Sequence, residues 1–185
     1  MDIMDAILTR RSVGKVKLDA VPRRLIEKLL HAAVQAPNHK RVRPWRFVVI
    51  TGKSREALGE VMANSLKGQD PLTSDSLLDL ERTKTLRAPL LIAAGVDKPA
   101  EPQLLEIENI CAVAAALENL LLAAHAQGLG AKWRTVPSSH TPAVKKFLGF
   151  SEDQELLGII YIGYPDLLPN AEERPSYEDR TTWME

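Results

Sequence analysis

Residues 106–127 read EIENICAVAAALENLLLAAHAQ, the longest helical pattern in the sequence. Apolar residues recur there at helical spacing and occupy nearly every side, which predicts a long helix buried at the centre of a domain. Gly128 follows and is suited to end the helix. Because Glu118, Asn119 and His125 interrupt the apolar run, it falls short of the roughly 20 apolar residues that cross a bilayer.

Shorter elements flank this helix on both sides. Runs of strand length, rich in apolar and β-branched residues, predict strands over residues 45–51, 89–96, 131–135 and 156–163. Apolar residues at helical spacing predict further helices over residues 2–9, 22–36, 54–66, 77–86 and 141–148. Pro37 is expected to stop the second of these, and Thr141 to cap the last. The pattern predicts an α+β domain with a small mixed sheet flanked by helices around the long buried helix.

Charge is distributed unevenly along the chain. The totals of 24 basic and 24 acidic residues cancel. Residues 10–46 nevertheless contain eleven basic and two acidic residues, a local net charge of +9, whereas residues 151–185 carry −7. The basic stretch suggests a polyanionic ligand. Residues 164–185 contain three prolines and no apolar period, so we expect residues 1–185 to form one domain in which 164–185 is an extension that wraps a partner subunit.

Composition disfavours several classes of protein. An apolar fraction of 45% and a charged fraction of 26% are typical of a globular protein rather than a disordered one. The single cysteine, Cys111, excludes an internal disulfide, and its place in the apolar pattern predicts a core position rather than a nucleophile. The four histidines lack metal-ligand spacing, so no metal site is expected. Residues 1–10 lack the features of a secretory signal, and we expect a cytoplasmic protein.

Three short motifs could bind a ligand. Arg10, Arg11 and Ser12 could clamp a phosphate, or the two arginines could merely oppose a helix dipole. The donor-rich loop APNHK (residues 36–40) precedes a strand, as many binding loops do, but a solvated basic turn fits equally well. GLGAKWRT (residues 128–135) would let a flat ligand approach the backbone, although a tight turn into a strand is the simpler interpretation. Glu106 and Glu108 suit the start of a helix, and no chemistry is expected of His125 at its end.

The order of these motifs resembles the nitroreductase family. RRS follows a short helix, APNHKxxxPW precedes a strand, and a buried helix leads to QGLGxxWRT. The resemblance extends to about Tyr164. It implies a nitroreductase-like fold and an interlocked homodimer with FMN at two interfacial active sites. It also implies that NADH or NADPH reduces the FMN, and that a nitroaromatic, quinone or similar electrophilic acceptor is reduced by a second hydride transfer.

The resemblance implies a role for particular residues. Arg10, Arg11 and Ser12 would hold the phosphate and ribityl end of FMN. Gln35 and His39 would reach the flavin from the partner subunit, and Trp133, Arg134 and Thr135 would line it on the first subunit. The nicotinamide nucleotide would contact Ala123, Ala124, His125, Ala126, Gln127 and Gly128. Because the flavin carries the hydride, no catalytic side chain is implied. Gln35 replaces an arginine common in the compact subgroup, and Gly14 replaces a lysine of many larger relatives.

Two alternatives remain open. The same fold could bind FMN for storage or process the flavin itself, without turnover of NAD(P)H. Alternatively, residues 10–46 could bind nucleic acid, although their cations are scattered over a helix, a loop and the start of a strand and form no known motif. We expect a homodimer with a small-molecule acceptor as its partner, and neither nucleic acid nor a membrane.

Overall fold

The computed structural model of the chain describes residues 1–135, 137–170 and 173–185. Its sheet has the order β1-β2-β4-β3, made of β1 (Trp45–Thr51), β2 (Leu90–Val96), β3 (Gly130–Arg134) and β4 (Glu155–Gly163). All three pairings are antiparallel, so the sheet is not the mixed one that we expected. The reason is the helical hairpin of α3 (Lys53–Gln69) and α4 (Asp75–Lys84), which returns the chain to the end of the sheet at which β1 finishes.

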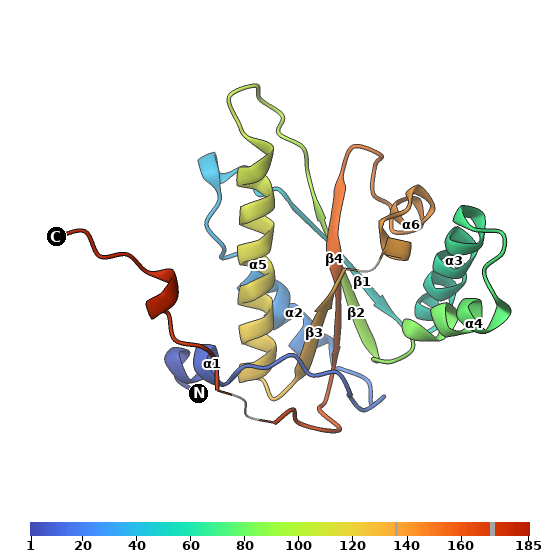
Figure 1. Cartoon of the computed structure of the whole chain (residues 1–185), viewed down its shortest axis with the longest axis horizontal. Helices are drawn as coiled ribbons and strands as arrows, with labels where there is room; N and C mark the ends of the chain where they lie inside the picture. The colour runs from blue at the N-terminus through green and yellow to red at the C-terminus, as the bar shows by residue number, and fades with distance from the viewer. Residues whose placement is uncertain (136, 171–172) are drawn as a thin grey trace.

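Helices cover both faces of the sheet (Figure 1). On one face, α5 (Glu106–Ala126) and α2 (Arg23–Ala33) enclose a core that includes Leu29, Ile92, Leu117, Leu120 and Ile160. On the other face, α3 and the short α6 (Pro142–Phe147) enclose a second core that includes Leu58, Met62, Leu91, Val144 and Ile159. Because β2 lies inside the sheet, its residues alternate between the two cores and are all buried.

Helix starts and ends follow local chemistry. Asp2 caps α1 (Ile3–Thr9) by accepting a hydrogen bond from the backbone N–H of Met4, and Thr141 caps α6 as predicted. The helix α2 ends at Ala33, earlier than the position set by Pro37, and the backbone N–H groups of Gln35 and Ala36 bond three residues back, to Ala32 and Ala33. Such tighter turns are common at helix ends. A short helical turn, η1 (His39–Arg41), then leads into β1.

The long helix α5 is the core helix that the sequence predicted, but one of its sides is open. Among the described helices it alone is long and apolar enough to cross a bilayer by length and composition, yet its buried residues pack against the sheet. Ile107 is exposed on the open side, and so is Cys111. The expected core position of Cys111 is therefore wrong: a helix that is apolar nearly all round does not reveal which side faces the sheet.

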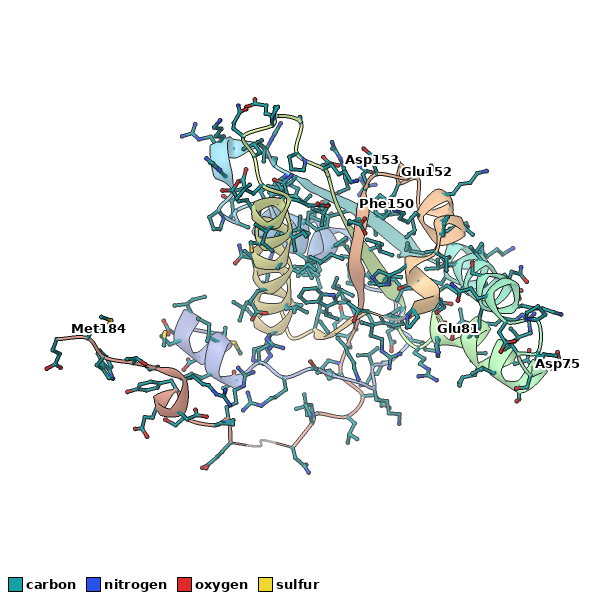
Figure 2. All side chains as sticks on the ribbon, turned by 45° about the horizontal axis from the view of Figure 1, so that its top comes forward. Asp75, Glu81, Phe150, Glu152, Asp153 and Met184 are labelled. Carbon is teal, nitrogen blue, oxygen red and sulfur yellow. The ribbon has the colours of Figure 1, made fainter. Side chains whose placement is uncertain are left out.

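Beyond β4 the chain leaves the sheet. Val16 pairs with Pro165, and the tail then passes α1, where Arg174 Nη2 donates to the backbone oxygen of Arg10 over 2.8 Å. The short turn η3 (Glu178–Arg180) follows, and Met184 lies at the far end of the tail, away from the sheet (Figure 2). Trp183 is also exposed. These apolar side chains make the tail a candidate for contact with another surface.

Candidate functional site

The segment that carries Arg10, Arg11 and Ser12 lies against the free edge of β3. Directly after it, the backbone N–H of Val13 donates to the oxygen of Ala131 over 3.0 Å. Further along, the backbone N–H of Lys17 donates to the backbone oxygen of Tyr164, which fixes the other end of the segment beside the last residue of β4. Two of the three sequence motifs, RRS and GLGAKWRT, are therefore adjacent in space although about 120 positions separate them in the chain.

Arg10 and Arg11 border a small hollow between the end of α1, the last turn of α5 and β3. Its lining is Arg10, Arg11, Leu121, His125, Leu129 and Ala131. Arg10 Nε lies 3.3 Å from Glu118 Oε1 on α5. Arg11 Nη1 donates to the backbone oxygens of Leu8 and Arg10. Ser12 follows these two arginines and is exposed.

The side chains of β3 alternate, so the predicted flavin-lining residues separate onto two sides. Trp133 packs with the α5 core, and its Nε1 donates to the backbone oxygen of Leu157 over 3.3 Å. Gly158 lets it pack closely, because a Cβ there would lie 2.3 Å from Trp133 Nε1. Arg134 lies on the opposite side, with its guanidinium 5.4 Å from the centre of the Tyr161 ring. Thr135 is exposed just after the strand.

A second hollow on the Arg134 side adds two basic residues that the sequence analysis did not single out. It is lined by Val13, Gly14, Val16, Arg87, Ala88, Lys132, Arg134 and Tyr161. Lys132 lies two residues before Arg134 on the same side of β3. Because alternate residues of a strand share a face, the sequence KWR could have indicated this pair of cations. Burial raises the pKa of Tyr161, with Arg134 opposing that shift, so this tyrosine stays neutral beside the cations.

His39 lies near the start of α5, and Gln35 lies just beyond the end of α2. Gln35 Nε2 donates to the backbone oxygen of His31, and His39 Nδ1 lies 3.0 Å from Glu108 Oε1. The hydrogen bond with His39 is the main cause that lowers the pKa of Glu108, followed by the hydrogen bond from the backbone of Leu105. Within one chain His39 contacts Glu108 and Arg10 contacts Glu118, so ten positions of α5 separate the two contacts.

Residues 123–128 end α5 beside Arg10 and Arg11. His125 Nε2 lies 2.8 Å from Thr9 Oγ1, so the histidine joins α5 to α1 rather than standing alone. Burial is the main cause that lowers the pKa of His125, and the charges of Arg10 and Arg11 add to it. Gln127 Oε1 accepts a hydrogen bond from Lys28 Nζ over 3.4 Å. The predicted nicotinamide segment therefore borders the predicted phosphate segment.

Acidic residues, most of them from the rest of the chain, pair with several cations of the basic N-terminal third. Ion pairs join Arg10 to Glu118, Lys15 to Asp166, Arg23 to Glu27, Lys40 to Glu101 and Arg46 to Asp97. The local charge of +9 along the sequence is therefore not a continuous basic surface. This pairing weakens the nucleic-acid alternative, which rested on that charge alone.

The fold and the basic site at the edge of β3 define a known class of protein. The model of the nitroreductase family matches residues 7–164. The chain therefore belongs to the nitroreductase family.

Individual relatives agree with that membership. The chain is 30% identical to the predicted NAD(P)H nitroreductase YdjA of Escherichia coli (strain K12) over 90% of both chains. It is 30% identical to the predicted NAD(P)H nitroreductase YfhC of Bacillus subtilis (strain 168), over 98% of this chain and 94% of YfhC. A solved nitroreductase-like protein from Bacillus cereus, 28% identical, superposes with a TM-score of 0.87 over 100% of this chain and 97% of that one. A nitroreductase from Desulfovibrio desulfuricans in complex with FMN, 25% identical, superposes with a TM-score of 0.73 over 96% and 94%.

Proposed function

We propose that this chain is a cytoplasmic, FMN-dependent NAD(P)H oxidoreductase that works as a homodimer and reduces nitroaromatic, quinone or similar electrophilic acceptors. The observation that carries the proposal is the placement of Arg10, Arg11 and Ser12 against β3. Lys132 and Arg134 add two further cations in the second hollow, on the other side of the same strand. The phosphate of FMN carries about two negative charges at neutral pH. Arginine forks bind such a group through paired hydrogen bonds. The donor set therefore fits the phosphate end of FMN.

The relatives support the nature of the cofactor and of the electron donor. YdjA and YfhC are named for NAD(P)H, and the Desulfovibrio desulfuricans structure contains FMN. Bound FMN supplies the hydride chemistry, so the side chains need only bind and orient. Cations near the flavin also favour the additional negative charge of its reduced form. Arg134, held over the ring of Tyr161, is our candidate for that role.

A two-fold axis across the open side of α5 would complete the site. His39 contacts Glu108 near the start of α5, and Arg10 contacts Glu118 in its second half, about 15 Å further along the helix axis. If two copies of α5 pack antiparallel, His39 of the partner subunit comes next to Arg10. The same side is apolar: the exposed large side chains there are Ile3, Met4, Ile7 and Leu8 on α1 and Ile107 on α5. Exposed apolar patches of this kind mark protein contacts.

The proposal also assigns the domain organisation. Residues 1–185 form one domain, in which residues 164–185 are an extension that wraps the partner subunit. The exposed Trp183 and Met184 support this assignment, because a tail without a core of its own gains by burying such side chains on another surface. The unpaired, exposed thiol of Cys111 is in keeping with a reducing compartment such as the cytoplasm.

Colour tests the proposal at once. Purified protein should be yellow, and NADH or NADPH should bleach its flavin absorbance in the absence of an acceptor. Repeated turnover with FMN recovered intact would exclude both storage of FMN and processing of the flavin. Colourless protein that also fails to take up added FMN would overturn the proposal. A panel of nitroaromatics, quinones and enones in the same assay then identifies the acceptor class.

A further inference from the structure

The loop between Pro37 and Pro44 has an unusual backbone. In the described part of the chain, the non-glycine residues with positive φ are Lys40 (48°), Arg41 (57°) and Arg43 (51°), all three of them basic. This left-handed conformation is unfavourable for residues that carry a Cβ. Strain of this kind is concentrated at sites of binding and catalysis. A strained backbone that presents only cations is therefore a candidate anion site.

Hydrogen bonds hold the loop in this conformation. Asn38 Oδ1 accepts from the backbone N–H of Arg43 over 2.9 Å, and Asn38 Nδ2 donates to the oxygen of Ala36 over 3.3 Å. The N–H of Val42 donates to the oxygen of His39 over 3.2 Å. A loop that is already ordered loses less entropy when it binds a ligand. These hydrogen bonds therefore hold the backbone of the basic residues in place before any ligand binds.

The charges of the loop are only partly compensated. Glu108 lies against His39 at 3.0 Å, and Glu101 lies against Lys40 at 3.6 Å. Arg41 and Arg43 are both exposed, and neither forms an ion pair with any residue that the structure describes. Two guanidinium groups on a fixed loop therefore remain available for an external anion. Two arginine forks suit a terminal phosphate, which carries two charges and several acceptor oxygens.

We propose that Arg41 and Arg43 bind the 2′-phosphate of NADPH and make the enzyme selective for NADPH over NADH. This inference rests on the proposed function and its dimer. In the antiparallel pairing of α5, the loop of one subunit comes next to residues 123–128 of the other, the segment assigned above to the nicotinamide nucleotide. NADPH differs from NADH only by the 2′-phosphate, whereas both coenzymes share the pyrophosphate. Contact between the unpaired charges of the loop and the 2′-phosphate would therefore distinguish the two coenzymes.

The test compares the wild-type holoenzyme with the double variant R41N/R43N. Asparagine tolerates the left-handed backbone, so the variant removes both charges without disturbing the loop. Calorimetry gives the Kd of NADP⁺ and of NAD⁺, and steady-state kinetics give the KM of NADPH and of NADH. We expect wild type to bind NADP⁺ more tightly, and the variant to lose about tenfold or more of that affinity while NAD⁺ binding is unchanged. The preference should also weaken below about pH 6, where a phosphate monoester gains a proton.

A matched control and the opposing outcomes make the test decisive. R23A/R24A also removes two arginine charges, from the exposed first turn of α2, and should leave the ratio of the Kd values of NADP⁺ and NAD⁺ unchanged. Equal loss of both coenzymes in R41N/R43N would indicate pyrophosphate contacts and overturn the inference, as would unchanged binding of both or a wild-type preference for NADH. In each of those cases a yellow, reducible protein leaves the proposed function intact. Colourless protein would instead refute the proposed function.

Discussion

Arg10 Nε lies 3.3 Å from Glu118 Oε1, so the residue that follows α1 is tied to the open side of α5. The side chain of Arg10 is only 18% exposed, whereas that of Glu118 is 50% exposed. The pair fixes one edge of the guanidinium and leaves its other N–H groups for another acceptor. Glu118 therefore positions Arg10 beside the hollow that His125 and Leu129 border.

Replacement of Arg10 by alanine should weaken FMN binding. The variant loses a charge-assisted contact, which predicts a loss of about 1.5–3 kcal/mol in binding free energy. Quenching of FMN fluorescence during titration of apoprotein measures the Kd. Arg24→Ala, on the exposed surface of α2, removes the same charge and should bind FMN as wild type does. Equal affinities for Arg10→Ala and wild type would remove Arg10 from the site.

His125 should make the apoprotein less stable in mild acid. Burial and the neighbouring Arg10 and Arg11 lower the pKa of His125, so the unfolded chain binds the proton more readily than the folded one. The stabilisation is present above the ordinary histidine pKa of about 6.5 and is lost as the pH falls below it. His125→Gln keeps an amide that can bond Thr9 and should show a smaller fall in Tm between about pH 7 and 5. A fall as large as in wild type would assign the effect to other groups.

The ion pair of Lys15 with Asp166 should stabilise the start of the extension at neutral pH. A hydrogen bond between the two side chains is the main cause that raises the pKa of Lys15 and lowers that of Asp166. The contribution is present above the ordinary aspartate pKa of about 3.9 and disappears as the pH falls through the lowered value. At the alkaline end it is lost as the pH rises through the raised pKa of Lys15. Asp166→Asn should therefore have a slightly lower Tm than wild type at pH 7 and the same Tm in strong acid; a difference that persists there would point to a cause other than charge.

Glu81 should be important for stability although it lies outside the proposed site. It lies on α4 (Figure 2) and is 2% exposed. Its carboxylate accepts a hydrogen bond from Ser138 Oγ and pairs with Lys84. Glu81→Ala leaves both partners without their acceptor, which predicts a loss of about 2–3 kcal/mol in the free energy of unfolding by urea. Asp79→Ala, which breaks an exposed pair with Arg82 on the same helix, should cost less than about 1 kcal/mol. Similar losses for the two variants would contradict the buried role of Glu81.

Truncation tests the extension. A chain that ends at Asp166 keeps the pair with Lys15 but loses Arg174, which bonds the backbone of Arg10. We expect this chain to dissociate into monomers at higher concentration than wild type and to retain less FMN, because the tail covers the partner subunit. Sedimentation velocity and flavin absorbance measure the two effects. A truncated protein that stays dimeric and yellow would refute the wrapping role.

Hydrophobic patterning predicted the elements but not how they are joined. The β-branched run at residues 45–51 became β1 with the same bounds, because a strand of this composition competes with no helical pattern. Strand direction followed instead from the helical hairpin of α3 and α4, which packs through tertiary contacts. The exposed position of Cys111 was also not predictable from the pattern, because only packing against the sheet distinguishes one apolar side of α5 from another.

The site was predictable only in part. The RRS and GLGAKWRT motifs did come together, and the strand period of KWR could have singled out Lys132, whereas Arg87 joins the site from a distant segment that no local motif reveals. Likewise the charge of residues 10–46 was misleading, because partners such as Glu118 and Asp166 lie far away in the sequence. The loop of Arg41 and Arg43 was recognisable as basic, whereas its strained backbone needed the structure.

The open side of α5 also carries a built-in chemical probe. Cys111 is the only cysteine of the chain, and its thiol lies on that side. An alkylating reagent therefore marks one known position in the unmodified protein. Fast alkylation would mean that solvent reaches this side of the helix, and slow alkylation that becomes fast on dilution would follow the separation of subunits. The native chain can thus report its own assembly by mass spectrometry, without a label or an engineered residue.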